Sequence, residues 1–218
     1  MRELRSRIIL ATALAVVVAA IGPQAASADT LTKLEGTAGC VADTASNLPA
    51  GTCVTAKGIN DATDIAISPD GKFLYAAATS SNSIAIFSRD QATGELTQLA
   101  GSAGCIAAQE APISGCATAN GLEGPSALAM SPDGKSVYVT TFTLDTAATP
   151  LPEIEGTLLT FTRNANSGAL TQNACVVGGV PPSGSAIPVP IPVSAPSGCT
   201  TATFTHCLLY TSPSPRDS

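Results

Sequence analysis

The feature that most constrains this chain is a long internal repeat. LTKLEGTAGC, from Leu31, returns as LTQLAGSAGC from Leu96 and, shortened, as LTQNAC from Leu170. Between these segments, DIAISPDGKFLYAAAT (64–79) returns as ALAMSPDGKSVYVTTF (127–142). Self-similarity of this kind is the signature of repeat architectures, in which each unit buries its core against its neighbours. We therefore expect packed copies of one small unit.

One repeat has the pattern of four short antiparallel strands. Ile65 and Ile67 alternate with small or polar residues, as in a half-buried strand. The SPDG segment that follows (68–71) supplies the proline, aspartate and glycine of a tight turn. Three further strands are expected, at 73–79, 83–88 and 95–99. Four antiparallel strands joined by tight turns make one blade of a β-propeller.

The second repeat carries the same turn formers, aromatic residues and arginine, which we interpret as structural rather than catalytic. The equivalent pairs are Ser68 and Ser131, Tyr75 and Tyr138, Phe87 and Phe161, Arg89 and Arg163, and Gly94 and Gly168. The expected fold is therefore all-β, a β-propeller of four-stranded antiparallel blades. We expect a truncated fragment: about two blades, near 63–99 and 126–173, and a closing strand that begins at Leu31.

The N-terminal residues 1–28 read as a secretory signal peptide. Arginines at the start precede an apolar run (8–21), and Ala26-Ser27-Ala28 is a small-x-small cleavage site. The alternative is an uncleaved anchor, but the run is shorter than the roughly 20 apolar residues of a spanning helix. We predict cleavage after Ala28 and a secreted or periplasmic protein without membrane insertion.

The C-terminal segment CLLYTSPSPRDS (207–218) follows no repeat pattern. It resembles the translation of a transposon-type sequencing adapter, and the alternative is a genuine Ser/Pro-rich tail. On the first interpretation the tail is non-native, and the propeller domain spans 29–206 as a fragment of a longer protein.

The cysteines fall in pairs, one pair per repeat, once Cys207 is set aside with the tail. The pairs are Cys40 and Cys53, Cys105 and Cys116, and Cys175 and Cys199. Because an exported protein meets oxidising conditions, we predict three disulfides within these loops. The alternative is a metal site, but CxxC spacing is absent and the one histidine is His206. We expect neither a metal nor a cofactor.

The segments SPDGKSVYVTT and SPDGKFLYAAA resemble the repeat of the lactonase-like, YVTN-type β-propellers, which usually have seven blades. The Gly-Cys-Ile and Gly-Cys-Val loops resemble those of exported bacterial members. The resemblance covers Leu31 to about Leu170. It implies the propeller fold and, as activity, lactone hydrolysis or muconate-type cyclisation, with His, Arg and Glu near the central channel. Such folds host many activities.

All elaborated loops are expected on one face of the propeller. They are the cysteine loops, an insertion at 144–155, and a proline-rich loop at 180–198. Loop variation on a rigid scaffold makes binding faces, although neutral drift is the alternative. Candidate binding residues on this face are Asn60, Asp61, Asp64, Glu123, Asp145, Glu153 and Glu155. Their carboxylates suit calcium, but calcium-loop spacing is absent, and solvated loop charges are the alternative.

The repeats contain no histidine, no nucleophile elbow and no metal motif, so the catalytic residues are unknown. We therefore expect an exported, non-catalytic binding or scaffold protein for an unknown extracellular ligand or protein. The alternative is a lactonase-like hydrolase, of 6-phosphogluconolactonase or muconate-cyclase type, with most of its site in other blades. The net charge of −6 and the lack of a basic patch argue against nucleic acid as a partner.

Overall fold

The computed structural model describes residues 33–145, 153–180 and 198–202. The predicted signal peptide, most of the proline-rich loop and the tail at 207–218 lie outside these residues, as do Leu31 and Thr32 of the predicted closing strand. Lys33 and Leu34 are not in a strand. The regular secondary structure of the described part is nearly all β, as the repeat predicts, and this part contains no helix long and apolar enough to cross a membrane.

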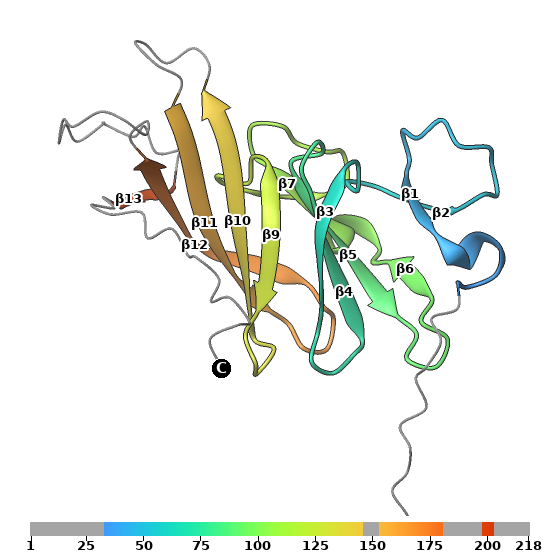
Figure 1. Ribbon diagram of the computed structural model, residues 1–218. Helices are drawn as coiled ribbons and strands as arrows, with labels where there is room; N and C mark the ends of the chain where they lie inside the picture. The colour runs from blue at the N-terminus through green and yellow to red at the C-terminus, as the bar shows by residue number, and fades with distance from the viewer. Residues whose placement is uncertain (1–32, 146–152, 181–197, 203–218) are drawn as a thin grey trace, which may run out of the picture. The chain divides into compact units, whose positions relative to one another are not determined.

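The first blade has the predicted strands. They are β3 (Ala62–Ile67), β4 (Phe73–Ala78), β5 (Ser83–Arg89) and β6 (Leu96–Gln98), each antiparallel to the next (Figure 1). The SPDG turn between β3 and β4 depends on Gly71, which has a φ of +69°. This left-handed backbone conformation favours glycine, because glycine has no Cβ.

The fourth strand of this blade is longer than predicted and comes in two pieces. Both β6 and β7 (Cys105–Ala108) pair with β5, and the short 3-10 helix η3 (Gly101–Gly104) separates them. In the second blade the equivalent strand, β12 (Leu170–Val180), is continuous. The sequence explains the difference, because LTQLAGSAGC has four more residues than LTQNAC and η3 accommodates them.

The second blade consists of β9 (Pro125–Met130), β10 (Ser136–Asp145), β11 (Glu153–Arg163) and β12. The prediction of a loop over 144–155 is wrong at its ends. The β10–β11 ladder continues without interruption to Asp145 opposite Glu153, so much of the insertion lengthens a hairpin (Figure 1). The register holds because the insertion adds residues to both strands. Residues 146–152 lie outside the described residues.

Three disulfides join the same cysteine pairs that the repeat predicts: Cys40–Cys53, Cys105–Cys116 and Cys175–Cys199. Each lies one position before a short parallel ladder, which the sequence analysis assigned to a loop. The ladders pair β1 (Val41–Asp43) with β2 (Val54–Ala56), β7 with β8 (Ala117–Ala119), and β12 with β13 (Thr200–Ala202). Strands of three residues are too short to show an alternating pattern.

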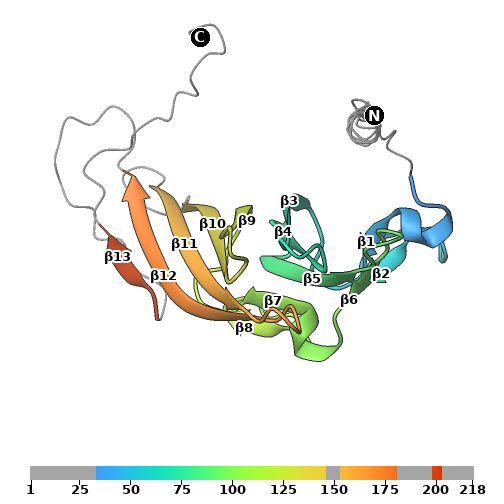
Figure 2. The ribbon, with the colours of Figure 1, turned by 90° about the horizontal axis from the view of Figure 1, so that it is seen from below.

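The main core lies between the two blades. Tyr75, Ile84 and Ile86 of the first blade are fully buried in one cluster with Val139 and Phe161 of the second. Strands β7 and β8, which extend the sheet of the first blade, contribute to the same cluster (Figure 2). Burial of this apolar surface is the dominant favourable term in holding the blades together.

The opposite face of the first blade has a smaller core. Leu74, Ala76 and Phe87 are buried there, with Val41 and Ala56 of the first parallel ladder. The β1–β2 ladder therefore covers the first blade in the way that β7–β8 covers the second. The predicted structural role of the two equivalent phenylalanines, Phe87 and Phe161, agrees with their complete burial.

Candidate binding pocket on the loop face

The described residues form an open pocket of about 470 Å³. It lies where the Cys40–Cys53 loop and the Cys105–Cys116 loop meet the β4–β5 turn. Its lining is mostly polar: Asp43, Thr44, Lys57, Gly58, Asn60, Ser80, Ser81, Ile113 and Ser114. The first two cysteine loops and the β4–β5 turn thus meet at this pocket. Of the predicted binding residues, Asn60 lines this pocket.

Lys57 is held in place by the glutamine of the LTQ segment. Its backbone N–H donates to Gln98 Oε1 at 2.9 Å, and Gln98 Nε2 donates to the Lys57 carbonyl at 2.8 Å. The Lys57 ammonium then donates to the Ser114 carbonyl at 3.1 Å. Lys57 therefore links the segment between β2 and β3 with the second cysteine loop. Its ammonium also places a positive charge in the pocket.

Asp43 lines the pocket but is occupied by the backbone. Its Oδ1 accepts from the Ala45 N–H at 2.8 Å, and its Oδ2 accepts from the Ile59 N–H at 3.1 Å. Hydrogen bonds to both oxygens hold the carboxylate in the loop. Asp43 consequently stabilises the pocket wall.

The floor of the pocket is a contact between two turns. The Asn60 N–H donates to Ser81 Oγ at 2.8 Å, and Ser80 Oγ donates to Asp61 Oδ2 at 3.2 Å. Asp61 has a φ of +59°, the left-handed conformation that aspartate tolerates better than most residues. Asp61, a predicted binding residue, therefore holds the turn beside the pocket.

Asp64, another predicted binding residue, accepts hydrogen bonds from both blades. Its Oδ2 accepts from the Leu128 N–H of β9 at 2.7 Å, and its Oδ1 accepts from the Ile65 N–H at 2.8 Å. The carboxylate thus joins the inner strands of the two blades. The repeat could not predict this contact, because the partner is a backbone group 64 residues away.

The remaining predicted residues are not brought together with the pocket. Glu123 is partly buried just before β9. Asp145 pairs with Glu153 in the register of the β10–β11 ladder, and Glu155 pairs with Thr143. Within the described residues, no group of three His, Cys, Asp or Glu side chains could hold a metal ion.

Lys57 and Asp43 are not among the binding residues predicted from the sequence. A usable signal for Lys57 is the repeated glutamine, since Gln172 makes the same pair of backbone hydrogen bonds with Asn120. Residues 57 and 120 therefore occupy equivalent positions shortly before the first strand of each blade, and a glutamine holds the backbone of each in place. Asp43 carries no such signal, because its partners depend on the folded loop.

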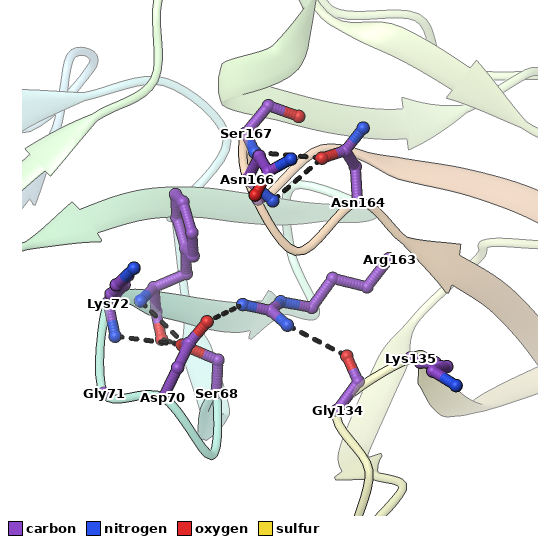
Figure 3. A network of polar contacts seen from close by, with 12 residues as sticks. Ser68, Asp70, Gly71, Lys72, Gly134, Lys135, Arg163, Asn164, Asn166 and Ser167 are labelled. Atoms are coloured by element: carbon purple, nitrogen blue, oxygen red, sulfur yellow. Dashed lines mark hydrogen bonds and ion pairs between the residues drawn. The ribbon is translucent and has the colours of Figure 1, made fainter.

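The strongest electrostatic effects lie away from the pocket, between the SPDG turns (Figure 3). Arg163 is buried and donates to Asp70 at 2.8 Å, to the Gly134 carbonyl at 3.0 Å and, through Nε, to the Tyr75 hydroxyl at 3.0 Å. Tyr75 in turn donates to the Gly168 carbonyl at 2.8 Å. Residues far apart in the sequence thus form one network between the blades.

The pKa values follow from these contacts. The Ser68 hydroxyl, followed by Arg163, lowers the pKa of Asp70 from 3.8 to about 2 against the opposing effect of desolvation. Burial raises the pKa of Tyr75. Burial also disfavours the Arg163 cation, but hydrogen bonds with Asp70 and Tyr75 outweigh it and raise its pKa. Perturbed groups often mark active sites, but this network joins two blades and is structural.

A family model described as "Lactonase, 7-bladed beta-propeller" matches residues 31–103, which is less than half of the chain. The matched segment contains the first cysteine loop, strands β3 to β6 and most of the pocket lining. The predicted lactonase-like propeller repeat is therefore confirmed. A search of curated proteins found no match.

Several solved structures are similar at low identity. A candidate 6-phosphogluconolactonase from Bacteroides uniformis is 21% identical with a TM-score of 0.39, over 56% of this chain and 28% of its own. Another, from Bacteroides fragilis, is 26% identical with a TM-score of 0.35, over 55% and 26%. The periplasmic gluconolactonase PpgL of Pseudomonas aeruginosa is 19% identical with a TM-score of 0.29, over 57% and 42%.

This chain spans less than half the length of each of these three proteins, and the similarity is too low to transfer an activity. At the level of the family, the match to the lactonase family model supports the lactonase-like alternative. The expectation of a non-catalytic scaffold receives no support from the comparisons.

Proposed function

We propose that this chain is part of a lactonase-like propeller whose loop face binds a lactone or the sugar acid derived from it. The observation that carries the proposal is the family match over residues 31–103, because that segment supplies most of the polar pocket. This function is the lactonase-like alternative predicted from the sequence, with the pocket as the binding site.

The chemistry of the pocket suits a hydroxylated ligand with a carbonyl or carboxylate oxygen. The Lys57 ammonium is the charged donor, and Thr44, Ser80 and Ser114 supply hydroxyl groups that donate and accept. A donor aimed at a lactone carbonyl would stabilise the negative charge that develops on its oxygen during hydrolysis. In this role Lys57 binds and polarises the ligand.

Lactone hydrolysis also needs a general base that activates water. Asp43 is the carboxylate of the pocket, and both of its oxygens already accept backbone N–H groups. Because these contacts give Asp43 a structural role, we take the base to come from residues outside the pocket lining. This observation favours a second candidate function, binding of the same ligands without turnover.

The test is to assay the exported protein against simple aldonolactones and to measure their binding calorimetrically. Lys57→Ala should weaken binding about tenfold, because a charged hydrogen bond is lost. Lys135→Ala is the matched control, since its exposed ammonium lies in the turn before β10, outside the pocket. Turnover above the uncatalysed rate supports the hydrolase, and binding without turnover supports the second candidate. No binding, or equal effects of the two variants, contradicts both.

A further inference from the structure

The frame of the pocket occurs again in the second repeat with a different side chain at its centre. A glutamine holds the backbone of residue 57 in the first repeat and of residue 120 in the second. In both repeats the glycine before the second cysteine makes room for the side chain of that residue. A Cβ at Gly115 would lie 3.2 Å from Lys57 Nζ, and one at Gly198 would lie 2.5 Å from Asn120 Nδ2. The same frame thus accepts a lysine or an asparagine.

The two repeats differ in the charge that this frame carries. The first repeat has Lys57 and, three residues later, Asn60, whereas the second has Asn120 and Glu123 at the same positions. A cation and an amide in one repeat are therefore replaced by an amide and a carboxylate in the other. Because both repeats keep the backbone contacts with their glutamine, the fold does not require the positive charge of Lys57. That charge is available for a ligand.

Lys57 and Asn60 both retain hydrogen-bonding groups for a ligand. The Lys57 ammonium has three donors, and one of them binds the Ser114 carbonyl at 3.1 Å. The Asn60 backbone N–H binds Ser81 Oγ, whereas the Asn60 side-chain amide makes no hydrogen bond within the described residues. Lys57 and Asn60 are both exposed residues of the pocket lining. Together they offer charged and neutral N–H donors, which suit the oxygens of a carboxylate.

The charges around the pocket favour a ligand with a single negative charge. Among the described residues that line it, Lys57 and Asp43 are the charged ones, and their charges cancel. A further carboxylate, that of Asp61, lies in the turn beside the pocket and accepts from Ser80. A carboxylate pairs with Lys57 through a charge-assisted hydrogen bond, which is stronger than the bond that a neutral lactone carbonyl accepts. An added phosphate would bring more negative charge near two carboxylates, and like charges disfavour binding.

We propose that Lys57 and Asn60 make this pocket selective for an unphosphorylated sugar acid, whose single charge is its carboxylate. The proposal rests on the proposed function, since it specifies which form of a hydroxylated ligand the same pocket binds best. Lys57 binds the carboxylate, and the Asn60 amide binds a carboxylate oxygen or a neighbouring hydroxyl group. The neutral lactone and the phosphorylated acid bind more weakly.

Calorimetry of the full chain with three probes that have the same carbon skeleton tests this selectivity. The probes are sorbitol, which is neutral, gluconate, which has one carboxylate, and 6-phosphogluconate, which has a phosphate in addition. Gluconate should bind about tenfold more tightly than sorbitol, because a hydrogen bond to a charged group is gained. The affinity for 6-phosphogluconate should be about tenfold lower than for gluconate, because its phosphate meets carboxylates. Added salt should reduce the preference of gluconate over sorbitol.

The second repeat supplies the variants, because it shows which residues the frame accepts. Lys57→Asn should bring the affinities for gluconate and sorbitol to within about twofold of each other. Asn60→Glu should weaken gluconate more than sorbitol, because it adds a carboxylate to the pocket. Lys135→Asn is the matched control, since it removes an exposed lysine outside the pocket and should leave the preference for gluconate unchanged. Circular dichroism checks that each variant is folded.

Equal affinities for sorbitol and gluconate would overturn this proposal and leave the proposed function standing, because the pocket would still bind a hydroxylated ligand. Tighter binding of 6-phosphogluconate than of gluconate would also overturn it, as would a gluconate preference that Lys57→Asn leaves unchanged. Unfolding of Lys57→Asn would overturn it as well, because the frame would then depend on the charge. Failure of all three probes to bind would contradict the proposed function itself.

Discussion

The two SPDG turns have nearly the same sequence and very different surroundings. Asp70 and Tyr75 meet a buried arginine from the next blade, and Tyr75 is fully buried. Asp133 and Tyr138 occupy equivalent positions, but Tyr138 is 40% exposed. In a repeat protein, burial is set by the neighbouring unit rather than by the residue type. The pair of turns therefore offers matched variants: Asp70 pairs with a buried arginine of the next blade, whereas the ion pair of Asp133 in the described part of the chain is with the exposed Lys135.

The largest difference is expected between the two arginines. Arg163→Ala should lower the free energy of unfolding by about 3 kcal/mol, because it leaves the Asp70 carboxylate and Tyr75 hydroxyl without their partner. Arg89→Ala should cost less than about 1 kcal/mol, since Arg89 is partly exposed and donates to the Gly71 carbonyl at 3.3 Å. Urea unfolding of both variants measures the difference, and equal losses would show that the network adds no stability.

A second contrast concerns the two aspartates. Asp70→Asn should cost about 2 kcal/mol, because Arg163 loses its counter-charge while it stays buried. Asp133→Asn should leave the free energy of unfolding almost unchanged, since its ion pair with Lys135 is exposed. Thermal unfolding of the pair checks this prediction. A larger loss from Asp133→Asn would indicate that its turn has a role beyond the ion pair.

The two tyrosines should differ in the same direction. Tyr75→Phe removes a hydroxyl that accepts from Arg163 and donates to Gly168, so two buried groups lose a partner. The expected cost is about 1.5 kcal/mol. Tyr138→Phe should be neutral within error, because its ring is partly exposed. Chemical denaturation separates the two, and a neutral Tyr75→Phe would mean that water replaces the hydroxyl.

The smallest expected effect is the dependence of stability on acid. Asp70 has a pKa of about 2 in the folded chain against an ordinary 3.8, so the unfolded chain binds the proton more readily. Its contribution is therefore present above about pH 4 and is lost as the pH falls toward 2. Because a third of the side chain is exposed, screening reduces this term to about 1 kcal/mol.

Asp70→Asn should flatten that part of the pH profile. Asp133 is the matched control, and its pKa is also lowered, first by the Ser131 hydroxyl and then by the Lys135 N–H. If Asp133→Asn flattened the profile as much as Asp70→Asn, the acid sensitivity would belong to the turn and not to the contact between blades.

Sequence alone predicted the strands of both blades because their signals are local. Proline, aspartate and glycine in SPDG define a turn within four residues, and the cysteine pairs repeat at equivalent places. Contacts between repeats gave no such signal. Asp70 and Arg163 are 93 residues apart, and each also fits a purely local role in its own turn or strand.

The predicted site was harder to place for the same reason. Asn60 lines the pocket, whereas Asp64 serves the contact between the blades. A carboxylate in a loop looks the same in the sequence whether it meets solvent, a ligand or a backbone N–H. The missed residues Lys57 and Asp43 also depend on partners from other loops or turns, since Lys57 reaches Ser114 and Asp43 reaches Ile59.

The disulfides determine where the sequence of this protein can vary during evolution. The cysteines of the three pairs are separated by 13, 11 and 24 residues, yet each pair leads into a parallel ladder of the same register. Neighbouring parallel strands usually need a connection of a dozen or more residues, whereas residues 109–116 suffice between β7 and β8. The loop between two paired cysteines can therefore vary in length and composition during evolution, while the disulfide and the parallel ladder at its base keep the sheet unchanged.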